Sequence, residues 1–145
     1  GSLFVIGTDN CIYRWNGGGW DRDSAGGSGT KIAVGPSGQP FVLNAGHHNS
    51  IWRRDESGWT QLPGAALDLA VGDDGSVFVI GTDQKVYRWT GAGWEEDSAG
   101  GAGTALTVGP SGQVFVLNAD VENSLYCRAT TGWIRVPGAA LALGA

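Results

Sequence analysis

Residues 4–20 read FVIGTDNCIYRWNGGGW, and residues 78–94 read FVIGTDQKVYRWTGAGW, 74 positions further along the chain. The match extends well beyond this stretch. When residues 3–71 are compared with residues 77–145, 41 of 69 positions are identical. Identity at this level over a constant spacing indicates an internal duplication, and a repeated unit is the first feature to establish in any fold prediction.

A weaker repeat lies inside each half. Phe4-Val5-Ile6 returns as Phe41-Val42-Leu43 after 37 residues, and Gly19-Trp20 returns as Gly58-Trp59 after 39 residues. The 145 residues therefore contain four units of about 37 residues, organised as two repeats over 1–74 and 75–145. We expect residues 1–145 to form one domain, because a chain of this length has room for one sizeable core.

Each unit contains four short strand patterns separated by turn-forming segments. In the second unit these strands are predicted over Thr30–Gly35, Pro40–Ala45, Ser50–Asp55 and Trp59–Leu62. The segments between them are rich in Gly, Pro, Ser and Asn, the residues that hairpin loops favour. No segment has the pattern of a helix. A tandem array of four-stranded antiparallel units predicts an all-β fold, specifically a β-propeller with four blades per chain. A β-solenoid is the alternative, although its repeats are usually shorter.

The two ends of the sequence predict how such a propeller closes. Ala145 aligns with Val71, so two full repeats lack only the three residues equivalent to 72–74. We therefore expect Ala139–Ala145 to supply the first strand of the blade that begins at Leu3. This pairing closes the ring within one chain, as four blades, or between two chains, as an eight-bladed homodimer. The dimer is favoured because four blades must splay by about 90° each to close alone.

The motifs resemble those of a known family. Residues 59–89 follow the pattern W-x-x-L-P-G-A-A-L-x-L-A-V-G-x-x-G-x-V-F-V, then V-Y-R-W after a short loop, and the other units carry related versions. This resembles the tectonin repeat over essentially the whole chain. The resemblance implies a lectin or an interaction module and not an enzyme, and it supplies no set of ligand residues. Members of the family usually carry more blades in one chain.

Composition excludes several classes of function. The net charge of −5 argues against nucleic acid and anionic membranes as partners, because both require basic patches. The 26 glycines accompany 41% hydrophobic residues, so they indicate turns in a folded chain and not disorder. The sequence contains no signal peptide and no transmembrane segment, so we expect a soluble protein without membrane insertion, in a compartment that the sequence does not name.

Candidate ligand residues lie where a glycine-rich crossing between blades meets a long polar loop. The crossing DSAGGSGT at 23–30 leads into the blade with the loop NAGHHNS at 44–50, and the second half repeats this pairing with DSAGGAGT at 97–104 and NADVENS at 118–124. Amide groups and aromatic faces suit sugar hydroxyls and C–H edges. The predicted sugar-binding residues are Asn44, Asn49, Trp52, Asn118, Asn123 and Tyr126. The alternative is that these asparagines only adopt left-handed turn geometry.

Other chemistry finds little support in the sequence. His47 and His48 align with Val121 and Glu122, so no metal pair is repeated and no metal or cofactor is expected. No nucleophile and base arrangement suggests catalysis. The tryptophans that follow Gly in every unit, Trp20, Trp59, Trp94 and Trp133, are interpreted mainly as packing between blades.

Three functions remain. The first is a multivalent lectin that binds glycans through weak repeated sites, with homodimerisation through blade closure. The second is a protein-interaction scaffold. The third is an engineered or excerpted symmetric propeller without a selected activity, which the high identity of the two halves also fits.

Overall fold

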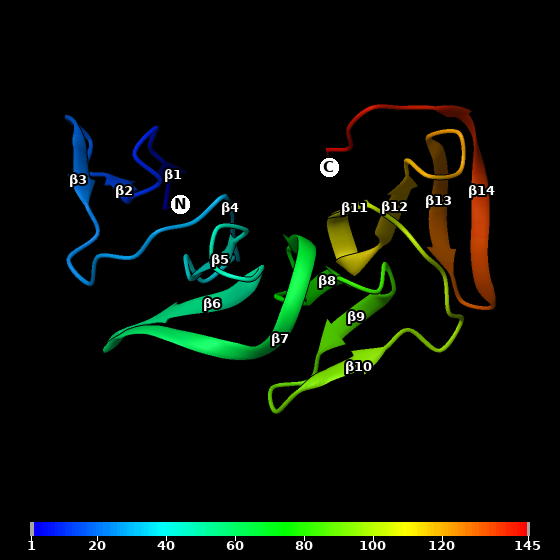
Figure 1. Ribbon diagram of the computed structural model, residues 1–145, viewed down its shortest axis with the longest axis horizontal. Coiled ribbons are helices and arrows are strands. Elements are labelled where there is room, and N and C mark those ends of the chain that lie inside the picture. The colour runs from blue at the N-terminus through cyan, green and yellow to red at the C-terminus, as the bar shows by residue number, and fades with distance from the viewer. Residues whose placement is uncertain (1, 145) are drawn as a thin grey trace.

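The computed structural model describes residues 2–144 and contains fourteen β-strands, arranged as four units along an arc (Figure 1). Unit 1 holds β1 (Phe4–Ile6), β2 (Ile12–Trp15) and β3 (Trp20–Arg22). Unit 2 holds β4 (Lys31–Val34), β5 (Pro40–Asn44), β6 (Ser50–Asp55) and the first part of β7 (Gly58–Val71). Unit 3 holds the second part of β7, β8 (Val77–Gly81), β9 (Val86–Trp89) and β10 (Trp94–Glu96). Unit 4 holds β11 (Ala105–Val108), β12 (Val114–Asn118), β13 (Ser124–Ala129) and β14 (Gly132–Ala139), with one 3₁₀ turn at Pro110–Gly112.

All pairings between strands are antiparallel, and the strands form three sheets, β1–β3, β4–β10 and β11–β14, within which each strand pairs with the next one along the chain. The predicted strands of the second unit agree with the observed ones to within about a residue at most of their ends. The all-β prediction is thus confirmed, and no α-helix occurs among residues 2–144. The repeated short strand patterns and the turn-forming segments between them account for this success.

Strand β7 joins units 2 and 3 into one seven-stranded sheet. Its first part, up to Ala65, pairs with β6, and its second part, from Ala66, pairs with β8. Figure 1 shows β7 leaving the outer edge of unit 2 and bending to the inner edge of unit 3. Gly64, with φ of +84°, lies at this bend, because a left-handed backbone conformation is easily adopted only by glycine.

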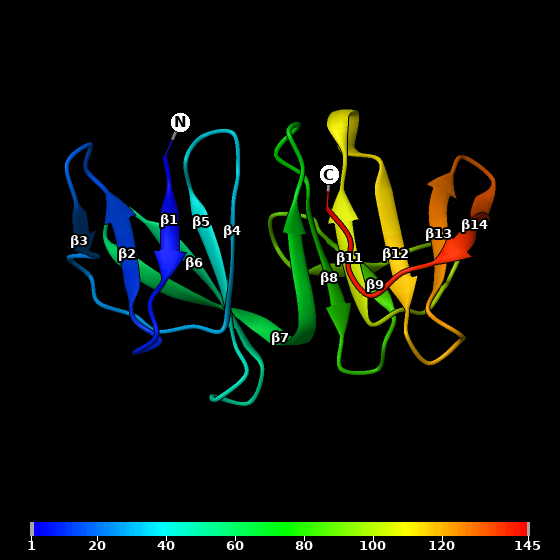
Figure 2. The ribbon, with the colours of Figure 1, turned by 90° about the horizontal axis from the view of Figure 1, so that it is seen from above.

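The inner strands of the four units lie next to one another: β1 contacts β4, β4 contacts β7, and β7 contacts β11. Side chains between the units form the core. One buried cluster fills the junction of units 2 and 3, and a second fills the junction of units 3 and 4. Figure 2 shows the same strands from the side, with the connecting loops collected at the two ends of the units.

A buried carboxylate ties three units together near the centre of the arc. Asp68 on β7 is 4% exposed and forms an ion pair with Lys31 of unit 2. Its second oxygen accepts a hydrogen bond of 2.8 Å from the backbone nitrogen of Leu106 in unit 4. The 74-residue equivalents of Lys31 and Asp68 are Ala105 and Ala142, so both members of the pair are absent together from the second half.

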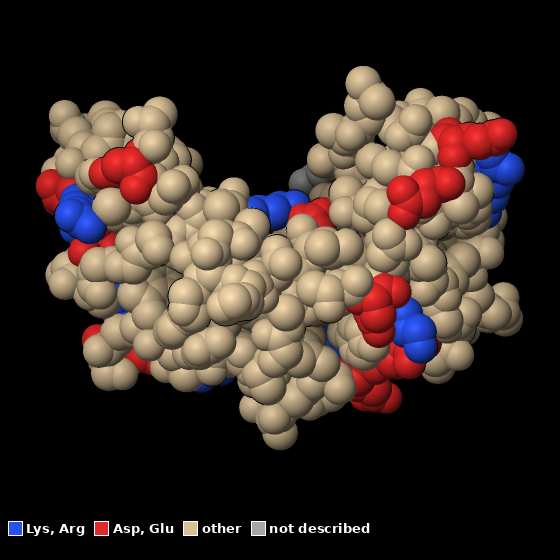
Figure 3. Space-filling view, viewed as in Figure 1, with Lys and Arg blue, Asp and Glu red and all other residues tan. Residues whose placement is uncertain are grey.

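The predicted closure of the ring is not formed in this structure. Unit 1 has three strands, and residues 140–144 are not part of any strand, while Ala145 lies outside the described residues. Figure 1 shows an open gap between unit 1 and the C-terminal segment, and Figure 3 shows a notch at the same place on the surface. The number of blades and the closure therefore stay predictions.

Candidate functional site

Two matching hollows lie at the crossings between units. The first hollow, between units 1 and 2, has a volume of about 310 Å³, and the second hollow, between units 3 and 4, has a volume of about 160 Å³. The first is lined mainly by Gly27, Ser28, Asn44, His47, Trp52 and Trp59. The second is lined by Gly101, Ala102, Val116, Asn118, Tyr126 and Trp133. Most of these positions correspond across the 74-residue repeat, as the sequence analysis expected for a repeated site.

The crossing that forms one wall of the first hollow is shaped by glycine and by a tryptophan. Trp59 donates a hydrogen bond of 3.0 Å from Nε1 to the carbonyl oxygen of Gly26. Gly27 follows with φ of +95°, and a Cβ atom added there would come within 2.6 Å of Trp59 Nε1. Only glycine therefore allows the backbone to lie directly on the indole.

The second hollow repeats this arrangement. Trp133 donates from Nε1 to the carbonyl oxygen of Gly100 over 2.9 Å, and a Cβ atom on Gly101 would come within 2.5 Å of the same nitrogen. The predicted packing between units is observed for Trp59 and Trp133, but not for Trp20, which is 44% exposed. Trp59 and Trp133 also line the hollows, which their assignment to packing alone did not anticipate.

An ion pair anchors the start of each crossing. Arg54 on β6 donates to both carboxylate oxygens of Asp23, at 2.9 Å and 3.2 Å through Nε, and the two side chains are 17% and 8% exposed. Arg128 on β13 binds Asp97 in the same way, at 2.9 Å to each oxygen. Burial acts to raise the pKa of the Asp23 carboxyl, but the hydrogen bonds from Arg54 and from the Ala25 backbone outweigh it and lower that pKa below its ordinary value.

Neither arginine was predicted from the sequence to have this role. The available signal was that both halves keep an aspartate and an arginine 31 residues apart, at 23 and 54 and at 97 and 128.

Four of the six predicted ligand residues line the hollows. Asn44 donates from Nδ2 to the hydroxyl of Ser28 over 3.1 Å, which joins the long loop to the crossing. Trp52 donates from Nε1 to Ser50 Oγ over 2.9 Å, so this hydrogen bond fixes the orientation of the ring beside the hollow. In the second hollow Asn118 and Tyr126 occupy the equivalent positions.

The other two predicted residues hold the loops. Asn49 and Asn123 both have φ of +54°, and neither lines a hollow. The carbonyl oxygen of Asn49 accepts a hydrogen bond from the backbone nitrogen of Ala66 over 2.9 Å, and that of Asn123 accepts one from Ala140 over 3.1 Å. Their backbone geometry is the left-handed turn geometry that asparagine tolerates, which the sequence analysis considered as the alternative.

A third hollow, of about 270 Å³, lies between units 2 and 3 and has different chemistry. Trp94 lines it and donates from Nε1 to the carbonyl oxygen of Pro63 over 2.7 Å. Tyr87 donates its hydroxyl to Asp83 over 2.6 Å. This hydrogen bond, with burial and the negative charge of Asp83, raises the pKa of Tyr87 to about 12.

A larger polar groove, of about 640 Å³, lies on the opposite end of units 1 and 2, where the PSG and ESG turns are found. It brings together three arginines and four acidic residues, so its charge is mixed. The groove is lined by Arg14, Arg22, Arg54, Asp21, Asp23, Asp55 and Glu56, among others.

Two classes of site are not found in the described part of the chain. Residues 2–144 bring no three potential metal-ligating His, Cys, Asp or Glu side chains together. No helix in the same residues is long and apolar enough to cross a membrane.

Comparison with known proteins gives one family. The family described as Tectonin domain matches residues 28–142, which is most of the chain. No curated protein sequence matches.

Solved structures with a similar fold have low sequence identity. The structure of YCF48 bound to a D1 peptide aligns with a TM-score of 0.56 and 15% identity, over 91% of this chain and 48% of that one. AofleA from Arthrobotrys oligospora aligns with a TM-score of 0.50 and 11% identity, over 96% and 54%. The fucose-specific lectin from Aleuria aurantia aligns with a TM-score of 0.50 and 15% identity, over 98% and 60%. The two last are β-propeller lectins, so the chain shares the β-propeller type of fold and spans about half the length of these structures.

Proposed function

The chain belongs to the Tectonin domain family, and from this premise we propose that it is a non-catalytic, carbohydrate-binding β-propeller. Sugars bind in the first and second hollows, so each chain offers two weak sites. Four-stranded units are its blades, and residues 1–145 form one propeller unit of two repeats, 1–74 and 75–145.

The observation that carries this proposal is the repeated combination of an aromatic wall and an amide in each hollow. Trp52 and Tyr126 occupy equivalent positions, and Asn44 and Asn118 are the amides beside them. A flat ring suits the C–H face of a sugar, and an amide offers both a donor and acceptors to hydroxyl groups. The full set of candidate residues stays as predicted, with Asn49 and Asn123 acting through the loop that they hold in place.

Fucose is the first sugar to test, because the two β-propeller lectins that align with the chain include one described as fucose-specific. Weak individual sites fit a lectin, since several sites in one assembly bind a multivalent glycan far more tightly than one site does. Closure of the ring, within one chain or as a homodimer, increases the number of sites held in one assembly.

The experiment is a titration with fucose and a panel of other monosaccharides, followed by tryptophan fluorescence and calorimetry. We expect two sites per chain. Trp52→Ala and Tyr126→Ala should each remove one site, and the double variant should remove both. Trp15→Ala is the matched control, because Trp15 is 41% exposed and lines neither hollow. Binding that survives in the double variant, or the absence of binding to every sugar on a glycan array, contradicts the proposal.

A protein-interaction scaffold is the second candidate, and one observation favours it. The structure with the highest TM-score quoted above is described as bound to a peptide. The polar groove between units 1 and 2 could accept a charged segment, because three arginines and four acidic residues line it. Substitution of Arg22 by Glu should then abolish capture of a peptide partner while leaving sugar binding intact.

A further inference from the structure

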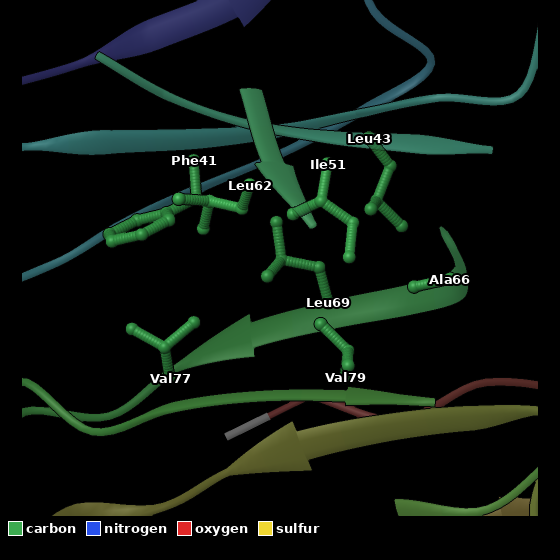
Figure 4. Packing of buried hydrophobic residues seen from close by; sticks show 8 residues of the cluster. All are labelled: Phe41, Leu43, Ile51, Leu62, Ala66, Leu69, Val77 and Val79. Carbon is green, nitrogen blue, oxygen red and sulfur yellow. The ribbon is translucent and has the colours of Figure 1, made fainter. Parts of the chain in front are cut away.

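The third hollow, between units 2 and 3, is separate from the two proposed sugar sites and is built on buried apolar side chains. Ile51 on β6 and Val79 on β8 line it and are 1% and 2% exposed. Both belong to the buried cluster that Figure 4 shows. The hollow therefore has a rigid apolar floor, because closely packed side chains do not yield easily.

Two aromatic rings that line the hollow are held in place by contacts within the protein. Trp94 packs edge-on against Trp89, with ring centroids 4.9 Å apart, and its Nε1 donates to the Pro63 carbonyl oxygen over 2.7 Å. The Tyr87 hydroxyl donates to Asp83 over 2.6 Å. The rings thus need little further ordering when a ligand binds, which lowers the entropy cost of binding.

Asp83 is the one charged side chain among the described residues that line the hollow. Its Oδ2 accepts the hydrogen bond from Tyr87, and its Oδ1 accepts one of 3.1 Å from the backbone nitrogen of Lys85. The Tyr87 hydrogen bond is the main influence on the Asp83 carboxyl and lowers its pKa below the ordinary value, so this group is ionised at neutral pH. The Lys85 side chain is paired with Glu96, at 3.3 Å, and does not line the hollow.

The turn that carries Asp83 is shaped to hold the carboxylate at the hollow. A Cβ atom added to Gly81 would come within 2.6 Å of Asp83 Oδ1 and 2.9–3.0 Å is already the distance to the ring of Tyr87, at Cε2 3.0 Å, so only glycine lets both groups lie against the backbone. Gln84 ends the turn with φ of +66°, and its carbonyl oxygen accepts a 2.8 Å hydrogen bond from the backbone nitrogen of Gly103. The carboxylate is therefore presented by a turn that other parts of the chain hold in place.

The groups left free in the hollow define the ligand. The indole N–H of Trp94 and the phenol O–H of Tyr87 already have acceptors inside the protein, and the other side-chain donor in the lining is Thr82, which is exposed. Each oxygen of the Asp83 carboxylate accepts one hydrogen bond and has capacity for another. The hollow therefore offers a negative charge, two aromatic rings and an apolar floor, and these attract a cation with apolar substituents.

We propose that the third hollow binds a small organic cation whose ammonium nitrogen carries methyl groups. The nitrogen lies near Asp83, and the methyl groups contact Tyr87, Trp94 and the apolar floor. An unsubstituted ammonium group is strongly hydrated and loses that water in an apolar hollow, whereas methyl groups are stabilised by the same surroundings. The volume of about 270 Å³ suits such a headgroup, since pockets for drug-sized molecules begin at about 300 Å³.

The chemistry of this site differs from that of the two sugar hollows. Among the described residues, the lining of those hollows contains an amide, Asn44 or Asn118, and no carboxylate. An amide suits neutral hydroxyl groups, whereas a carboxylate beside aromatic rings suits a positive charge. Cation binding is therefore an additional activity, and it does not depend on whether the first two hollows bind sugars.

The first measurement compares two ligands of nearly the same shape on the unmodified chain. Choline carries a trimethylammonium group, and in its neutral analogue neohexanol a carbon atom replaces the nitrogen. We expect choline, titrated by calorimetry at constant ionic strength, to bind more tightly than neohexanol by about tenfold or more. Equal affinity for the two ligands, or no binding of choline at millimolar concentration, overturns the proposal.

Two charge variants locate the cation. Asp83→Asn removes the charge with little change of shape and should weaken choline binding by about tenfold or more. Glu95→Gln is the matched control, because it removes a negative charge from an exposed side chain on β10, outside the hollow, and should leave choline binding unchanged. Unchanged binding in Asp83→Asn overturns the proposal, and so does an equal loss in both variants, which a general charge effect would produce.

A second pair of variants tests the aromatic wall. Tyr87→Phe retains the ring and should keep the affinity for choline within about threefold, whereas Tyr87→Leu should weaken binding by about tenfold. Equal affinities in these two variants contradict contact between the methyl groups and the ring and overturn the proposal. If circular dichroism shows that Asp83→Asn does not fold, the Tyr87 pair and the comparison of choline with neohexanol decide.

A competition experiment separates this site from the proposed function. Saturation with choline should leave the fucose titration unchanged, because the two ligands occupy different hollows. Displacement of choline by fucose would show that the third hollow is a sugar site and would overturn the inference. A chain that binds choline but no sugar supports the cation site while contradicting the lectin proposal.

Discussion

Replacement of Gly27 by alanine is expected to damage both stability and the first hollow, whereas the same change at Gly26 is expected to be mild. Both glycines have positive φ, +70° at Gly26 and +95° at Gly27. No heavy atom lies within 4 Å of a Cβ atom on Gly26, but Trp59 Nε1 lies 2.6 Å from one on Gly27. The pair therefore separates backbone strain from contact with the indole.

The magnitudes follow from these contacts. An alanine forced into the left-handed region costs about 1–2 kcal/mol at either position. At Gly27 the indole must also move away, which breaks the 3.0 Å hydrogen bond to the Gly26 carbonyl and loses about 1 kcal/mol more. Including the disturbed packing of Trp59, we expect Gly27→Ala to lower the free energy of unfolding by about 3–4 kcal/mol, and Gly26→Ala to lower it by about 1–2 kcal/mol.

The assay is urea denaturation followed by tryptophan fluorescence, together with a sugar titration of each folded variant. A difference of about 2 kcal/mol between the two variants corresponds to a difference of roughly 8 °C or less in melting temperature. Gly27→Ala should also weaken binding in the first hollow, because Trp59 forms part of its wall. Equal destabilisation by the two substitutions would refute the close contact between the crossing and the indole. Unchanged binding in Gly27→Ala would refute the role of Trp59 in the hollow.

Three further predictions concern charged and phenolic groups. Arg54→Ala should lower the free energy of unfolding, measured in urea, by about 1.5–3 kcal/mol, because the buried Asp23 carboxylate loses the arginine that binds both of its oxygens. An effect below about 0.5 kcal/mol would show that the pair is solvated. Stability should fall as the pH decreases below about 4, because the pKa of Asp23 is lower in the folded chain than in the unfolded one and the unfolded chain therefore takes up a proton first. In Asp23→Asn this part of the acid dependence should disappear from thermal melts recorded between about pH 2 and pH 6. Asp83→Asn should bring the pKa of Tyr87 down from about 12 toward the ordinary value near 10. The measurement is a titration followed by ultraviolet absorbance, with Tyr87→Phe as the reference. An unchanged titration would contradict the hydrogen bond between Tyr87 and Asp83.

Much of the local structure could be predicted from the sequence because it depends on short-range rules. Strands such as β5 and β6 could be predicted from the turn-forming segments on either side of them and from their recurrence in the other units. The duplication predicted that any site would occur twice, and Asn44 and Asn118 do line equivalent hollows. These features are repeated, and a repeat makes each weak local signal count several times.

Other features depend on which units come together in space. The sequence could not show that Trp59 would lie on Gly27, or that Arg54 would reach back to Asp23, because these residues belong to neighbouring units and meet only after the units pack. The closure of the ring was predicted from alignment of the two ends, but the pairing of residues 139–145 with unit 1 is not present among the described residues.

The amino-acid sequence by itself determined the four units, their strands and their arrangement as two similar halves, because strand-forming residues and turn chemistry act within each unit. The tertiary structure alone decided which loops form hollows, which tryptophans gain a carbonyl partner and which apolar faces stay open. The physical reason is that units with nearly the same sequence differ in their neighbours. Trp94 lies against unit 2 and is partly buried, while Trp20, with almost the same local sequence, lies at an open end of the arc and is exposed.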